Sequence, residues 1–141
     1  MPQPTIRTPW EQLFTSLRKL RTAWPARGWS WDSRLGCISS SFGSEFEDQA
    51  RSAASEAFPN AWTPSTVSKA STTLRDVVEK SGGLRSGQLL LSGRPVGRVT
   101  PYGLWWPWQT GLMISLRVGL TLVDWNEEPF PELRDLFAVT M

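Results

Sequence analysis

The chain has 141 residues, of which 40% are hydrophobic and 20% are charged, and its net charge is +2. These values are typical of a globular protein and fit a single domain over residues 1–141. Histidine chemistry and an internal disulfide are excluded, because the chain has no histidine and Cys37 is its only cysteine. No apolar run reaches the roughly 18 residues of a membrane span, and the N-terminal residues lack a signal-peptide core. We therefore expect a cytoplasmic protein with no membrane partner.

Apolar residues spaced by three or four predict a first helix near the N-terminus. Thr8 is its expected N-cap, Glu11 completes a capping box, and Pro25 ends it. The face that this helix buries consists of Trp10, Leu13, Phe14, Leu17, Leu20 and Trp24. The following residues, Ala26 to Gly43, mix tryptophans with glycines and serines, and we expect a partly extended stretch lying over the core.

Two more helices are predicted in the next forty or so residues. Ser44 and Glu47 form a second capping box, and the alanine-rich helix that follows ends at Pro59. Thr63-Pro64 repeats the Thr-Pro start of the first helix. This third helix stops at Gly82-Gly83, a left-handed C-terminal signal.

The remaining segment has the pattern of strands. Gln88–Leu91 and Val96–Val99 are short candidates joined by a turn. Strict alternation over Leu112–Val123 predicts a half-buried strand of an antiparallel sheet. Its even-numbered residues are apolar, whereas its other face carries mixed residues such as Arg117 and Gly119. After Pro129 and Pro131, a short helix bears Leu133, Leu136 and Phe137.

These elements predict an α+β fold. About three N-terminal helices would pack on one face of a small antiparallel sheet, with a short C-terminal helix closing it. The mixed face of the sheet would be solvated or occupied by a partner.

The residues that commonly carry catalysis are scarce. One cysteine without histidine leaves no usual zinc site, and Cys37 is best interpreted as a small buried thiol. Ser81-Gly82-Gly83 lacks the lysine of a phosphate-binding loop. We therefore predict no catalytic residue, no metal and no cofactor, and not an enzyme. A carboxylate-dependent hydrolase is the less favoured alternative, because no acid pair stands in an apolar setting.

Tryptophan is unusually abundant, with nine copies. Three of them fall in the segment Pro101–Trp108, where neighbouring residues of an extended chain point to opposite sides. Trp105 and Trp106 therefore cannot both face one core. Tryptophans at a surface anchor protein interfaces or stack on bases and sugar rings. The structural alternative is that the cluster only covers Gly119 on the outer face of the sheet.

Charge is unevenly distributed along the second half of the chain. Residues 82–123 contain four arginines and no acid, and they are Arg85, Arg94, Arg98 and Arg117. Residues 124–141 contain five acids and one base. The two segments either pack together or leave the arginines free for an anionic partner.

These observations favour a non-catalytic protein–protein interaction module or a small subunit of a larger assembly, such as an adaptor, an immunity protein or a chaperone. The partner would be another protein or a second copy of the chain. The alternative is a nucleic-acid or glycan binder that uses a Trp/Arg surface on the sheet. The residues predicted to bind the partner are Trp105, Trp106, Trp108, Arg98 and Arg117.

Overall fold

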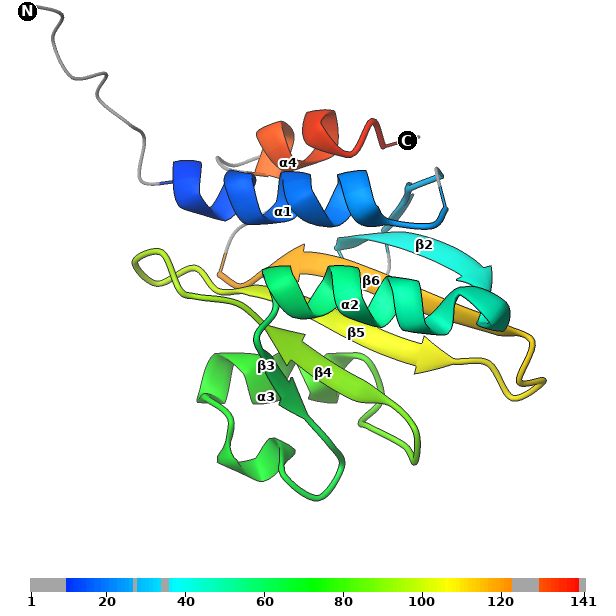
Figure 1. Cartoon of the computed structure of the whole chain (residues 1–141). Helices are drawn as coiled ribbons and strands as arrows, with labels where there is room; N and C mark the ends of the chain where they lie inside the picture. Colours follow the sequence, from blue (N-terminus) through cyan, green and yellow to red (C-terminus); the bar gives the residue numbers. More distant parts are fainter. Residues whose placement is uncertain (1–9, 27, 34–35, 123–129, 140–141) are drawn as a thin grey trace, which may run out of the picture.

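The computed structural model describes residues 10–26, 28–33, 36–122 and 130–139. Within these residues the chain is α+β, with four α-helices and a six-stranded antiparallel sheet (Figure 1). In chain order the elements are α1 (Glu11–Ala23), β1 (Ser30–Asp32), β2 (Cys37–Gly43), the 3-10 turn η1 (Ser44–Phe46), α2 (Glu47–Ala57), β3 (Asn60–Trp62), the 3-10 turn η2 (Val67–Lys69), α3 (Thr72–Lys80), β4 (Leu89–Ser92), β5 (Pro101–Pro107), β6 (Met113–Leu120) and α4 (Phe130–Leu136).

The strands are ordered β1-β2-β6-β5-β4-β3, so β1 and β3 form the two edges of the sheet. The hairpin of β5 and β6 occupies the centre. It pairs Trp106 with Ser115 and Leu104 with Arg117. On its other side β6 pairs with β2, which brings Ser39 opposite Arg117 and Ser41 opposite Ser115. Because paired residues share a face, these contacts fix which side chains stand together.

Helices α1, α2 and α4 lie on one side of the sheet, which we call the first face (Figure 1). The even-numbered residues of β6 are buried there, as their alternation predicts. The strand is shorter than the predicted Leu112–Val123, and Leu112 and Leu122 at the two ends of that range are exposed. Helix α1 buries Leu13, Leu17 and Leu20 toward them. Helix α2 buries only alanines, and these small side chains let it pack closely against α1. Each buried leucine stabilises the fold by about 1.5–3 kcal/mol.

Helix α3 packs on the opposite side of the sheet, the second face. Its buried Leu74 and Val78 join Leu90 of β4 and Leu104 of β5 in a smaller apolar cluster. The prediction that all helices cover one face is therefore wrong for α3. The predicted order is also wrong, because the helices are interleaved with the strands instead of preceding them.

The stretch from Ala26 to Gly43 contributes two strands of the sheet, β1 and β2, and does not merely lie over the core. The alternation of polar and apolar residues in β2 is obscured by Ser40, which is buried on the first face among apolar residues. The indole N–H of Trp24, which directly follows α1, donates a hydrogen bond to the Ser40 hydroxyl (3.0 Å). This bond makes a buried serine tolerable there.

The helix boundaries correct three expected N-termini. Helix α1 begins at Glu11 with Trp10 as its N-cap, and the proposed capping residue Thr8 lies outside the described residues. Ser44 starts a 3-10 turn and makes no capping bond to α2. Thr63 opens a turn, in which its N–H bonds to Thr66 Oγ1 (2.8 Å).

Helix α3 begins later than its predicted start, at Thr72, and has Ser71 as its N-cap. The Ser71 hydroxyl accepts a hydrogen bond from the Leu74 N–H (3.4 Å). The predicted glycine stop is confirmed. Gly82 and Gly83 have φ of 99° and 88°, and the Gly83 N–H bonds back to the Val78 carbonyl (2.8 Å).

The segment Pro101–Pro107 forms a central strand, β5, which is not among the strands that the sequence pattern predicts. Its prolines stand at its first and last positions, where a missing backbone donor is tolerated. The expected strand Val96–Val99 is only an isolated bridge within a turn. The C-terminal helix is confirmed as α4, with Leu133 and Phe137 buried.

Candidate functional site: the open half of the second face

The second face is divided between a covered half and an open half. Helix α3 and its cluster cover β3, β4 and most of β5. None of the described helices packs on the second face of β1, β2 and β6 (Figure 1). We call this region, with the end of β5, the open half-face. Its side chains include Asp32, Ser39, Ser41, Trp108, Met113, Ser115 and Arg117, and Trp106 lies at its border with the α3 cluster.

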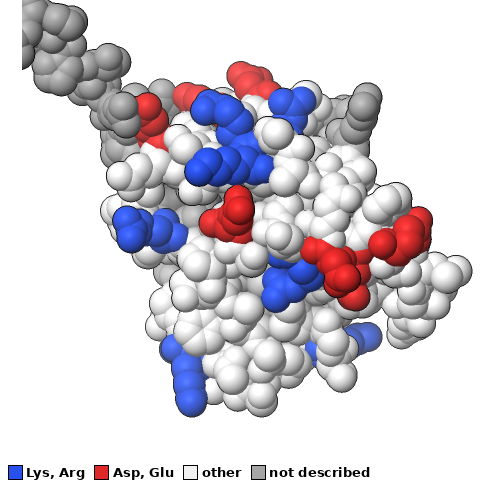
Figure 2. Space-filling view, in the orientation of Figure 1, with Lys and Arg blue, Asp and Glu red and all other residues white. Residues whose placement is uncertain are grey.

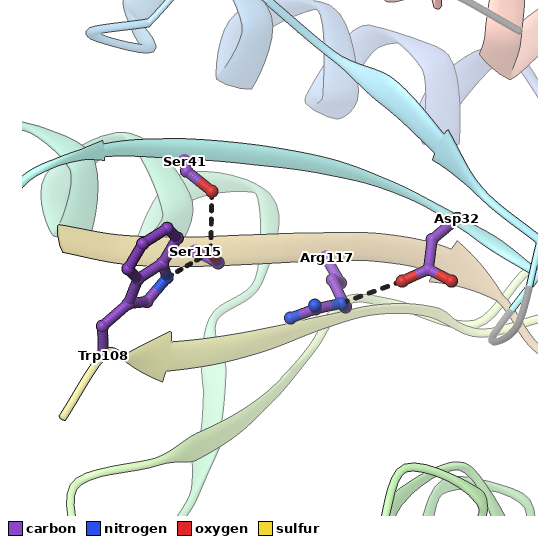
Figure 3. Close-up of polar contacts among 5 residues, drawn as sticks. All are labelled: Asp32, Ser41, Trp108, Ser115 and Arg117. Atoms are coloured by element: carbon purple, nitrogen blue, oxygen red, sulfur yellow. Dashed lines mark hydrogen bonds and ion pairs between the residues drawn. The ribbon is translucent and has the colours of Figure 1, made fainter.

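Trp108 is the most exposed aromatic side chain of the open half-face, with 48% of its surface accessible. It follows β5 directly, and its backbone N–H bonds to the Met113 carbonyl (2.8 Å). Its indole N–H donates to Ser115 Oγ (2.8 Å), and Ser115 shares a second hydrogen bond with Ser41 (2.7 Å; Figure 3). The ring is therefore exposed, but its indole N–H is held by Ser115.

Arg117 is held between a carboxylate and an aromatic ring. Its Nε donates to Asp32 Oδ2 (3.2 Å), and both side chains are 18% exposed. Its guanidinium carbon lies 4.3 Å from the centre of the Trp106 ring, a cation–π distance. In Figure 3 its terminal nitrogens lie on the side away from Asp32, toward the end of the sheet that carries Trp108. This arrangement leaves an immobilised cation with N–H groups directed over the face.

Tyr102 closes the boundary between the two halves. It is buried and faces Gly119 across the strand pair, where a Cβ atom on residue 119 would collide with the phenol. Desolvation by burial raises the pKa of Tyr102 far above its ordinary value, and the nearby Cys37 and Asp32 raise it further. The phenol is thus a neutral packing group at ordinary pH.

The structure separates the five residues that the sequence predicted to bind a partner. Trp106, Trp108 and Arg117 are brought together on the open half-face. Trp105 faces the opposite way, buried in the core near Phe42 (5.6 Å between ring centres) and under Arg51. Arg98 is exposed in the turn before β5, at the end of that strand far from Trp108. Trp105 and Arg98 are therefore not part of the candidate site.

Sequence reasoning did not single out Asp32, Ser41 or Ser115 as functional residues. Asp32 and Ser41 lie on strands whose alternation is obscured in the sequence, and their partners are 85 and 74 residues away along the chain. Ser115 was placed correctly on the outer face, but a serine there gives no signal that it binds an indole. Only the pairing of β2 with β6 reveals these partners.

A cavity lies elsewhere, on the helix-covered side. It measures about 680 Å³ and is lined by α1, the end of α2 and the turn after β4, including Glu11, Glu56 and Arg94. Glu56 is exposed to solvent, so it lacks the apolar setting that makes a carboxyl a general acid. Cys37 is fully buried, as expected. Among the described residues, no group of three or more His, Cys, Asp or Glu side chains could hold a metal ion.

Three of the acids expected to neutralise the arginines, Asp124, Glu127 and Glu128, lie outside the described residues. On the face drawn in Figure 2, basic and acidic side chains are interspersed, without an extended patch of one sign. No helix in the described part of the chain is long and apolar enough to span a membrane. Comparison with protein-family models, curated proteins and solved structures found no match to this chain.

Proposed function

We propose that this chain is a non-catalytic protein-binding module whose partner contacts the open half-face. The observation that carries the proposal is Trp108, which is about half exposed yet oriented by Ser115. A ring that is already fixed loses little conformational entropy when a partner covers it. Covering its remaining surface would contribute about 2–3 kcal/mol.

The neighbours of Trp108 support a protein partner. Tryptophan and arginine are enriched among the residues that dominate protein interfaces. Trp108 and Arg117 stand on one face, and Leu112 at the tip of the same hairpin is 69% exposed. Ser41, opposite Ser115 on β2, is small and exposed, and it leaves room for a partner's backbone near the sheet. Adaptor, immunity and chaperone roles, and a cytoplasmic location, all fit this class and stay predictions.

A nucleic-acid or glycan ligand is the alternative on the same surface. Residues 82–123 contain four arginines. In the described part of the chain, Arg117 is the one of them that contacts side chains of the open half-face, through an ion pair and a ring contact. It is the one cation among the described side chains of the open half-face, whereas affinity for a nucleic acid comes from several phosphate contacts. The geometry therefore favours a protein partner over a nucleic acid.

A photocrosslinking experiment tests the proposal. A benzoylphenylalanine replaces Trp108 in one variant and Thr22 in a control, because Thr22 is exposed on α1 on the other side of the sheet. We expect a discrete protein adduct from position 108 in cells of the native source, and none from position 22. A second copy of the chain in that adduct would make the module a homo-oligomer, which light scattering would verify.

Three results would overturn the proposal. The first is no adduct from position 108, and the second is the same adducts from both positions, since either would mean that the open half-face has no special role. The third is an adduct to nucleic acid or glycan at position 108 in place of protein, which would select the alternative.

A further inference from the structure

The size of the open half-face limits what kind of protein segment can occupy it. Neighbouring strands lie about 4.8 Å apart and each residue advances about 3.3 Å, so six residues each of β2 and β6 and three of β1 cover roughly 240 Å². β2 and β6 pair over six residues, from Ile38 to Gly43, and β1 adds the third strand. A stable interface between folded domains needs about 800 Å² from each partner. The surface therefore suits a short segment of chain better than a domain face.

Two anchor points lie along β6 at a defined spacing. The indole of Trp108 is fixed to Ser115, and Arg117 stands two residues further on the same face. Residues two apart on a strand are separated by about 6.6 Å. An extended peptide has the same repeat, so two of its side chains, two positions apart, can contact Trp108 and Arg117 together.

The chemistry of each anchor selects a side chain. The exposed ring of Trp108, beside Leu112, matches an apolar or aromatic group. Arg117 bonds to Asp32 through Nε and stacks on Trp106, and its terminal nitrogens have no hydrogen bond or ion pair among the described residues. The terminal nitrogens of a guanidinium form a planar fork that fits both oxygens of a carboxylate.

We propose that the open half-face binds a short extended peptide segment that carries an aromatic residue and a carboxylate two positions apart. The aromatic side chain covers Trp108, and the carboxylate takes the terminal N–H groups of Arg117. Asp32 remains on Nε, on the other side of the guanidinium, so the two carboxylates share one cation. This inference rests on the proposed protein-binding function and specifies the partner's chemistry.

Four capped hexapeptides test the inference. Two carry phenylalanine and aspartate two positions apart, one in each order, so that both directions of the bound peptide are tested. The other two replace aspartate with asparagine. Binding is followed by the NMR shift of the Trp108 indole N–H, assigned with W108F. We expect the protein to bind at least one aspartate peptide about tenfold more tightly than the matching asparagine peptide. This difference in affinity should decrease as the salt concentration rises.

The variant R117Q completes a double-mutant cycle with the same peptides. We expect the preference for aspartate to fall to about one, while R18Q, which removes an exposed arginine of α1 on the other side of the sheet, leaves it in place. Thermal unfolding checks that both variants fold, and R117K, which keeps the charge but not the fork, replaces R117Q if that variant does not fold.

The outcomes separate this inference from the proposed function. Equal binding of aspartate and asparagine peptides, or no binding by any of the four, overturns the inference. If position 108 still crosslinks to a protein in that case, the proposed function stands with a different partner chemistry. If the crosslink is also absent, both proposals fall.

Discussion

The two halves of the second face use the same sheet in opposite ways. The covered half presents Leu90, Tyr102 and Leu104, and α3 packs on them. The open half presents serines and the Asp32–Arg117 pair, whose polar groups bond among themselves. The difference indicates that a helix docks where large apolar side chains gain from burial. Hydroxyls that already bond to each other, such as those of Ser41 and Ser115, give a helix no such gain.

The largest expected effect comes from removing an apolar side chain on the covered half. L104A should lower the free energy of unfolding by about 2–5 kcal/mol, because Leu104 is fully buried beneath the α3 cluster. S41A on the open half should change it by less than about 0.5 kcal/mol, since Ser41 is exposed. Urea denaturation of both variants measures the contrast, and similar losses in the two would contradict the division of the face.

A smaller effect is expected from pH at the boundary of the two halves. Burial keeps the pKa of Tyr102 raised in the folded state, whereas the phenol of the unfolded chain ionises near pH 10. Above that pH the unfolded state releases a proton that the folded state retains, so stability falls by about 1.4 kcal/mol per pH unit.

Tyr102 is the only tyrosine, so phenolate absorbance should appear together with unfolding and not before it. Y102F provides the control, because it removes this titration and should weaken the dependence of stability on pH in the same range. Phenolate formation in the folded protein near pH 10 would show that the Tyr102 side chain is not shielded from solvent.

The smallest effect is expected on the open half, from S115A. The variant removes the acceptor of the Trp108 indole N–H and the partner of Ser41, at a cost of about 1 kcal/mol. The indole N–H of Trp108 should then exchange faster with solvent, as measured by NMR. S41A should leave that exchange unchanged, because Ser115 still accepts the bond; an equal effect from both variants would mean that the whole chain of hydroxyls orients the ring.

Much of the fold could be predicted from local pattern. Helix α1, the alternation of β6 and the glycine stop after α3 follow from periodicity and from conformations that few residues other than glycine adopt. β2 could not be predicted, because Ser40 breaks its alternation and is stabilised by Trp24, sixteen residues earlier. The face of the sheet that α3 covers could not be predicted either, because an amphipathic helix has the same sequence pattern whichever face of the sheet it packs on.

The same limit applies to the candidate site. The alternation of an extended chain by itself determined that Trp105 and Trp106 point to opposite sides, and that Arg117 shares a face with Ser115. Only the tertiary structure decided that Trp105 is buried, that Trp108 is fixed by Ser115, and that Asp32 reaches Arg117. The physical reason is that sidedness is set by backbone geometry within a strand. Which side becomes the interior depends on the strands and helices that arrive from distant parts of the chain.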